Sequence, residues 1–392
     1  MHLPFLLLFS MAVLPLLSEN IYAPALPALA AYFKAPVTLV EATLSIYFAG
    51  FALGIFMWGC MADRIGRRFS MIAGWVVYIF ATWICSISTD ISVFFLARFV
   101  QAFGASVGSV IGQTMTRDVY HGKERSVVFT KIGIYLALAP ALGPLVGGTL
   151  STYFGWQSNF YFLLVLSFSL LIYMVWKLPE TKPLNMPIPR PFWLMNKMIR
   201  DPFIWVSSLI VATSNGLAFS FYAEGPFIWE NYFHYGMQSY GYLGLLFAGS
   251  AILGGIIGHR LLKHFTAEAM NLIAAALLLI SGFIAYTLML FSYDIVAQTF
   301  ILICLVMMLF VTFNIGVPST LATALQRYQE YSGTAASIFG CMYYIIVAIF
   351  TYGISWFHNG SPVVYPLYFT GIAALLFIVL VGQYGMTRRR IA

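Results

Sequence analysis

Charged residues are scarce in this sequence. Asp, Glu, Lys and Arg make up 8% of its 392 residues, whereas hydrophobic residues make up 61%. A soluble domain carries about 25% charged residues, so a chain of this composition has too little polar surface to cover its apolar residues in water. The composition excludes an ordinary soluble protein and predicts one that lies in a lipid bilayer.

Cysteine is also rare, and its four copies form no pattern. They lie within or at the edge of apolar runs without zinc-site spacing, so we interpret them as packing residues. The sequence has no G-x-x-x-x-G-K-[ST] phosphate-binding motif and no His, Asp, Glu or Cys cluster of catalytic or metal-ligand spacing. We therefore expect neither ATP hydrolysis nor any other enzyme activity, and no cofactor or metal.

Long apolar runs dominate the chain. A helix rises about 1.5 Å per residue and the hydrocarbon core is about 30 Å thick, so a span needs roughly 20 apolar residues. The first run is too long for a signal-peptide core and has no basic stretch before it. On this basis we predict twelve membrane-spanning helices, at 3–29, 40–62, 69–88, 91–116, 126–151, 157–177, 203–224, 239–258, 269–290, 295–321, 333–354 and 363–385.

Basic residues are concentrated on one side of this predicted topology. The connections after the even-numbered spans and the C-terminal tail hold nearly all of them, whereas the opposite connections hold Lys34 beside Glu41, Asp90, Glu230 and Asp294. This bias places both termini in the cytoplasm of a bacterial inner membrane. It also accounts for the net charge of +7 through attraction to anionic lipid, so no nucleic-acid partner is expected.

The longest polar connection, 178–202, contains six prolines and no apolar period. It divides the chain into two six-helix halves, 1–177 and 203–392, with a cytoplasmic linker between them. Two such halves are typical of secondary transporters, in which two bundles rock about a site near the middle of the membrane.

Three ionisable residues inside apolar spans are candidates for function, because an ionisable group there costs at least ~2.5 kcal/mol. Glu19, beside Asn20, lies deep in the first span, and Arg98 lies in the fourth. The alternative for Arg98 is a structural role, bonded to backbone carbonyls of the first or second span. Glu224, at the outer end of the seventh span, is placed to face a central cavity with Glu19; the alternative is a solvated rim glutamate.

The turn after the second span, 59–68, joins glycines to one acid among three arginines. It indicates an ion-paired latch that closes the cytoplasmic side, and the alternative is simple anchoring by positive charge. The latch residues are Gly59, Asp63, Arg64, Gly66, Arg67 and Arg68.

This turn resembles the G-x-x-x-D-R-x-G-R-R signature of the major facilitator superfamily. The run 96–105 is similar to that family's arginine motif, which implies proton coupling between Arg98 and an acid in the first span. The fifth span resembles the antiporter motif of drug:proton exporters, with small residues and prolines that favour a bent, tightly packed helix. Its residues are Gly133, Pro140, Gly143, Pro144, Gly147 and Gly148.

Further runs resemble one branch, the bicyclomycin/chloramphenicol-resistance (Bcr/CflA) exporters: 21–27, 44–54, 117–120, 178–181 and 333–337. The resemblance implies an all-α membrane protein with twelve transmembrane helices in two pseudo-symmetric six-helix bundles. It also implies a monomer that exchanges protons for small amphipathic organic compounds. The branch usually has Asp where this chain has Asn20, so Glu19 is one residue, about 100° on a helix, out of register.

Candidate substrate contacts are polar or aromatic residues on the spans that line such a cavity, or next to them. They are Tyr22, Tyr47, Gln113, Tyr135, Asn215, Phe219, Tyr222 and Asn314. Two other functions stay open. The first is dedicated export or import of a siderophore or metabolite by the same fold. The second is a transporter-like sensor or assembly protein that no longer translocates.

Overall fold

Long helices make up the described part of the protein. The structure, a computed structural model, describes residues 4–122, 124–125, 127–128, 131–132, 139–183 and 191–391, without the side chains at 139–141, 330, 332 and 384–391. The helices are α1 (Phe5–Asn20), α2 (Leu26–Phe33), α3 (Val37–Ile65), α4 (Arg67–Ile87), α5 (Ile91–Val119), α7 (Ala139–Phe154), α8 (Gln157–Lys177), α9 (Pro191–Ile199), α10 (Pro202–Phe227), α11 (Met237–Leu261), α12 (Ala267–Phe291), α13 (Ile295–Ala324), α14 (Ser332–Phe357) and α15 (Val364–Ile391).

Among the described residues, eleven helical segments are long and apolar enough to cross a membrane. Each corresponds to one span predicted from the sequence. The remaining predicted span, 126–151, is described only in part, and its continuous portion is α7. Several helices begin at residues that cap them: Asp90, Asp201 and Asp294 each accept hydrogen bonds from backbone N–H groups of the first turn.

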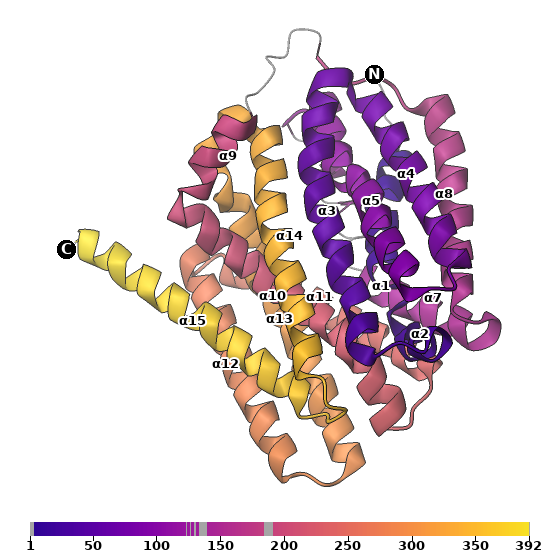
Figure 1. The fold of residues 1–392 in the computed structure, drawn as a ribbon. Coiled ribbons are helices and arrows are strands. Elements are labelled where there is room, and N and C mark those ends of the chain that lie inside the picture. Colours follow the sequence, from indigo (N-terminus) through magenta and orange to yellow (C-terminus); the bar gives the residue numbers. More distant parts are fainter. Residues whose placement is uncertain are drawn as a thin grey trace.

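The helices before and after the 178–202 connection form two bundles that lie side by side (Figure 1). The bundles meet along α3 with α14 and along α7 with α11. We call the upper end in Figure 1, which carries the α3–α4 turn and α9, the basic end, and the lower end, which carries α2, the opposite end.

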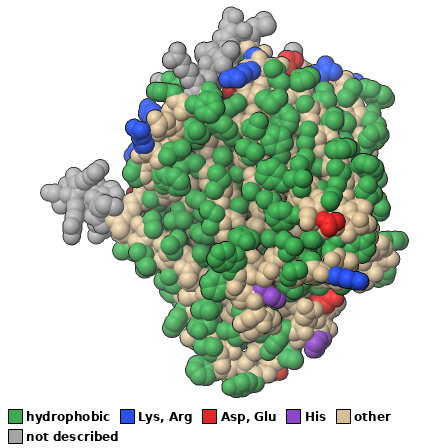
Figure 2. All heavy atoms as spheres, in the orientation of Figure 1, with side chains coloured by type: hydrophobic (Ala, Val, Ile, Leu, Met, Phe, Trp, Pro, Cys, Tyr) green, Lys and Arg blue, Asp and Glu red, His purple; other side chains and the backbone are tan. Residues whose placement is uncertain are grey.

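The face of the molecule in Figure 2 is apolar over most of its area. Large side chains such as Phe154, Trp176 and Phe291 are at least 74% exposed. A surface of this kind is stable in lipid and not in water, where contiguous apolar patches are limited to a few hundred Å². The protein is therefore a multi-pass membrane protein.

The first span is not one continuous helix. α1 ends at Asn20, a short 3₁₀ turn covers Ala23–Ala25, and α2 follows. Pro24 and Pro27 explain the break, because proline lacks the N–H that an α-helix interior requires. The polar residues Ser18, Glu19 and Asn20 thus occupy the last turn of α1, where backbone carbonyls lose their helical partners.

The 178–202 linker contains the helix α9, which the sequence analysis did not predict because the linker is rich in proline. α9 is amphipathic, with Leu194 and Met198 buried against Ile204 and Phe339 of the second bundle. The expectation of a connection without apolar period is therefore wrong over Pro191–Ile199. Residues 184–190 lie outside the described part.

Candidate functional site

A buried arginine lies next to the broken end of α1. Arg98, on α5, is fully buried, and both of its terminal nitrogens donate to the Ser18 carbonyl at 3.4 Å. A cation at this position complements the partial negative charge of a helix C-terminus. Its guanidinium also lies over two aromatic rings, with centroids at 4.1 Å for Tyr22 and 4.3 Å for Tyr47.

Gln101, on the same helix as Arg98, is a further hydrogen-bond partner of the arginine. Arg98 Nη1 donates to Gln101 Oε1 at 2.5 Å, and Gln101 Nε2 donates to Thr82 of α4 at 2.8 Å. Thr82 in turn donates to the Tyr78 carbonyl at 2.7 Å. This chain of bonds ties the cation to α4 and α5, so the structure gives Arg98 the backbone contact of the structural alternative together with a polar network that the sequence did not reveal.

The Glu19 carboxyl lies near this cation without an ion pair to it. Its side chain is 2% exposed, and within the described residues Oε1 has no hydrogen-bond partner. The charge of Arg98 acts on it. Glu19 also interacts electrostatically with three tyrosines. They are Tyr47 of the first bundle and Tyr343 and Tyr344 of the second. The carboxyl therefore faces the boundary between the two bundles.

Asn20 points elsewhere. A Cβ built at Gly143 of α7 would overlap the Asn20 side chain, and one at Gly147 would overlap the Ile21 carbonyl. α7 also packs closely on α11, where Gly148 meets Gly241. The glycines predicted as an antiporter motif thus bring α7 against both bundles, as small residues do in membrane helices. Gly133 lies outside the described residues, and Pro140 and Pro144 lie in α7.

Aromatic side chains fill the boundary next to Glu19. Phe48 of α3 contacts Phe219 of α10, with ring centroids 4.2 Å apart, and Phe51 contacts Tyr344 of α14 at 4.7 Å. Tyr343 and Tyr344 stack beside each other at 4.5 Å. Such a surface suits flat or amphipathic organic ligands, since most of the contact area in small-molecule sites is apolar and aromatic.

A cavity of about 200 Å³ opens between the bundles toward the basic end. Gln113 and Arg117 of α5 line it from the first bundle, and Phe339 and Tyr343 of α14 from the second. Its volume is below the ~300–1,000 Å³ of ordinary ligand pockets. An organic molecule of drug size therefore requires the bundles to separate further before it fits.

The remaining predicted substrate contacts differ in their surroundings. Phe219 and Tyr222 contact each other, with centroids 5.7 Å apart. The amides of Asn215 and Asn314 each donate to a carbonyl of their own helix, at 2.9 and 3.0 Å. Tyr135 lies outside the described residues.

The predicted latch is built around Arg67, which is 1% exposed. It pairs with Asp63 at 2.5 Å and with Asp118 of α5 at 3.3 Å. Asp63 also accepts a hydrogen bond at 3.4 Å from Thr334 of α14, which joins the two bundles at the basic end. Gly59 approaches α14 in the same region, at Ser337.

A glutamate outside the predicted latch holds its turn in place. Glu180 accepts the backbone N–H groups of Arg67 at 2.9 Å and Arg68 at 3.1 Å, so it caps the start of α4. Gly66 turns with a φ of +106°, and a Cβ there would meet the Glu180 carboxylate. Arg64 contributes its carbonyl, which accepts a bond from Lys182 at 2.8 Å, while its side chain is exposed. Glu180 belongs to the run 178–181, whose resemblance to the exporter branch was the only feature of the sequence that pointed to this residue.

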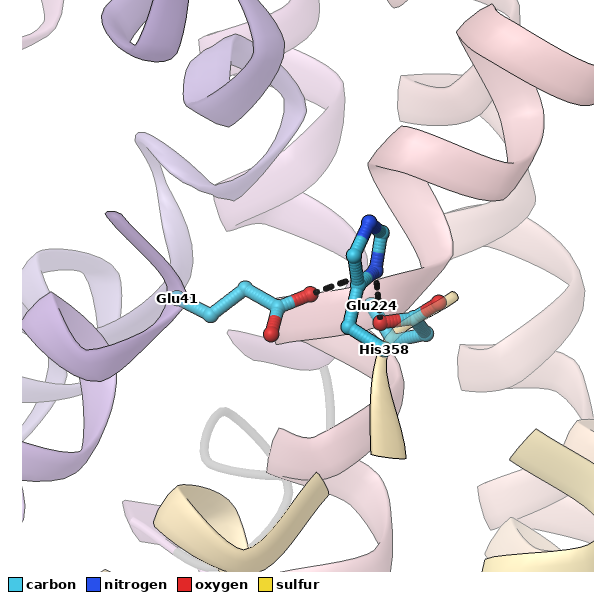
Figure 3. Close-up of side chains that lie close together, drawn as sticks. All are labelled: Glu41, Glu224 and His358. Carbon is cyan, nitrogen blue, oxygen red and sulfur yellow. Dashed lines mark hydrogen bonds and ion pairs between the residues drawn. The ribbon is translucent and has the colours of Figure 1, made fainter. Parts of the chain in front are cut away.

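Glu224 lies at the opposite end, in a cluster that joins both bundles (Figure 3). It is fully buried, and its Oε2 lies 2.8 Å from His358 Nδ1. Glu41 of α3, also fully buried, lies 3.6 Å from the same nitrogen. Glu41 lies in the second turn of α3, which corrects its expected place in a connection, whereas His358 directly follows the end of α14. The packing of α3, α10 and α14 brings the three side chains together.

Two helical bundles in an apolar shell, with a polar and aromatic site at their boundary, define a membrane transporter of the alternating-access class. Comparison with known families agrees. Residues 8–351 match the Major Facilitator Superfamily, and the chain belongs to this family.

Relatives and solved structures fit this assignment. The chain is 33% identical to an uncharacterized transporter of Rickettsia bellii, over 96% of this chain and 94% of that protein. It is 24% identical to a bicyclomycin resistance protein homolog of Haemophilus influenzae, over 97% and 95% of the two chains. The xylose transporter XylE from E. coli shares the fold, with a TM-score of 0.75 at 11% identity over 96% of each chain.

Proposed function

We propose that the protein exports small amphipathic organic compounds from the cytoplasm in exchange for protons. In this proposal it works as a monomer, and both termini face the cytoplasm of a bacterial inner membrane. The observation that carries the proposal is Glu19, a buried carboxyl near the charge of Arg98 and the aromatic boundary of the bundles, one of whose oxygens has no hydrogen-bond partner among the described residues. The resemblance to a bicyclomycin resistance protein homolog supports the substrate class.

In the proposed cycle a proton and a substrate compete for the region around Glu19. Substrate enters through the cavity lined by Gln113 while the opposite end is closed. Protonation from outside neutralises Glu19 and releases the substrate, and loss of the proton to the cytoplasm prepares the site again. Each ligand shifts the bundles only to the extent that it binds one state better than the other.

Arg98 sets the charge near Glu19, and Tyr22, Tyr47, Phe219 and Tyr222 offer aromatic contact to the substrate. Asn215 and Asn314 supply polar groups from the second bundle. Asp63, which is held by Arg67, closes the basic end through its contact with Thr334 of α14 when the bundles rock. Glu224 is the second proton-coupling candidate, because it is the other buried acid predicted to act and it links the bundles at the opposite end.

The test uses purified protein in liposomes with a pH-sensitive dye, and bicyclomycin and ethidium as probes. We expect substrate-dependent proton movement in the wild type and its loss in Glu19→Gln. Glu268→Gln is the matched control, because Glu268 is exposed in the first turn of α12. Unchanged exchange in Glu19→Gln, with loss in Glu224→Gln, would transfer the proton role to Glu224. No proton movement with any probe in the wild type would contradict the proposal.

A further inference from the structure

The geometry points to a divalent transition-metal site of the zinc type, formed by Glu41, Glu224 and His358 across the two bundles at the opposite end. One ligand atom from each residue lies within 4.8 Å of the other two. Glu41 belongs to the first bundle, and the other two belong to the second (Figure 3). The site is separate from Glu19, Arg98 and the cavity beside Gln113.

Oxygen atoms outnumber hydrogen-bond donors in this cluster. The His358 Nδ1 has room for one hydrogen, which serves Glu224 Oε2 at 2.8 Å. Within the described residues, both oxygens of Glu41 and the Oε1 of Glu224 receive no hydrogen bond from an N–H group or a hydroxyl, although both side chains are fully buried. The two carboxyl groups lie close enough to hydrogen-bond each other only when one of them is protonated. A buried carboxylate without a donor is costly. A cation among the three side chains removes that cost for both carboxylates.

The distances fit a small ion. Zinc binds imidazole nitrogen and carboxylate oxygen at about 2.0–2.2 Å, so tetrahedral ligand atoms lie about 3.3–3.5 Å apart. The observed separations from Nδ1 are 2.8 Å to Glu224 and 3.6 Å to Glu41, on either side of that range.

The ligand set selects the kind of metal. Two carboxylates balance the charge of a divalent ion, and an imidazole favours zinc-like ions over calcium or magnesium, which prefer more oxygen ligands. The His358 side chain is 17% exposed, so water and the ion can reach the cluster beside this residue. Because the ligands come from both bundles, a bound ion stabilises the conformation in which this end is closed.

The test is calorimetric titration of Zn²⁺ into the full-length protein in detergent after removal of metals with EDTA. We expect one Zn²⁺ per chain in the wild type and at least tenfold weaker binding in each of Glu41→Gln, Glu224→Gln and His358→Gln. His234→Gln, an exposed histidine that follows α10, is the control and should bind as the wild type does.

Thermal unfolding provides a second readout. Zn²⁺ should raise the melting temperature of the wild type and of His234→Gln, but not that of Glu41→Gln or His358→Gln. Wild-type protein that binds no more Zn²⁺ than a triple variant overturns the proposal, and so does equal affinity in the wild type and the variants. If Glu224→Gln does not fold, the other two variants and the zinc-dependent shift decide the matter.

Discussion

Asn20 of α1 occupies the space that a side chain at Gly143 of α7 would need. The next glycine on that face, Gly147, is closer still, because a Cβ there would overlap backbone at Ile21 rather than a movable side chain. The two helices therefore touch at their backbones. Position 20 serves packing, and position 19 is left to face the bundle boundary.

This contact predicts that methyl groups added at different glycines lower the stability of the protein by different amounts. Gly147→Ala should lower stability by about 1–3 kcal/mol, the usual range for overpacking, and Gly143→Ala should lower it less because Asn20 can rotate. Gly249→Ala on α11 is the control, since no residue of the described ranges outside its own helix lies within 4 Å of its Cβ position. Melting temperatures measured in detergent give the order of stability of these three variants. Equal stability of Gly147→Ala and Gly249→Ala would contradict the contact.

The network around Arg98 predicts a specific role for Gln101. Gln101→Leu removes the acceptor of Arg98 Nη1 and leaves the buried cation with the Ser18 carbonyl and two rings. A buried polar group that loses its partner costs about 1–3 kcal/mol, so the variant should unfold at lower temperature. Gln238→Leu, on the partly exposed start of α11, should behave as the wild type. A Gln101→Leu protein of unchanged stability would show that Gln101 is dispensable for holding Arg98.

The α1 region shows what could and what could not be predicted. The sequence predicted that Glu19 and Asn20 point in different directions, because the helical repeat alone requires it. It did not predict Gln101 as the partner of Arg98, since a polar residue three positions along a helix has no feature that separates it from any other. Glu41 was expected in a connection because it begins a predicted span, and His358 follows the end of α14; only the packing of α3, α10 and α14 brings them together.

Glu180 gives a prediction that depends on pH. Although partial burial acts in the opposite direction, hydrogen bonds from backbone N–H groups hold its pKa below the usual value of 4.5. A carboxyl whose pKa is lower in the folded state stabilises the fold above its unfolded-state pKa and loses this contribution as the pH falls through the folded-state value. Glu180→Gln should therefore reduce the melting temperature at pH 7.

The difference between Glu180→Gln and the wild type should then shrink as the pH falls below the usual glutamate pKa of 4.5 toward the lower folded-state pKa of Glu180. Glu268→Gln serves as control at both pH values. A difference that stays constant from pH 7 to the acid range would mean that Glu180 acts through its shape and not through its charge.

The latch predicts different effects for its two contacts. Thr334→Val removes one long hydrogen bond between the bundles, worth about 0.5–1.5 kcal/mol at most. Asp63→Asn also removes the charge opposite buried Arg67, and unpairing a buried charge costs more. We expect transport in liposomes to fall by less than about tenfold in the first variant and further in the second. The reverse order would place the closing contact at Thr334.

The linker helix α9 predicts an effect on stability rather than on transport. Leu194 is 1% exposed, so Leu194→Ala should cost about 2–5 kcal/mol through the cavity that it leaves. Ile199→Ala, at the exposed end of the same helix, is the matched control, because Ile199 is 44% exposed. Thermal unfolding distinguishes the two. Equal melting temperatures would mean that α9 contributes nothing to the second bundle.

The bonds that run from Arg98 through Gln101 to Thr82 end inside the first bundle. If the two bundles rock as rigid bodies, this arginine keeps its place relative to α4 and α5 throughout the cycle. It then contributes a fixed field, and the charge carried across the membrane in one turnover is that of the bound proton and substrate alone. A neutral and a cationic substrate should consequently differ by one elementary charge per cycle, a difference that appears directly in the dependence of transport on membrane voltage.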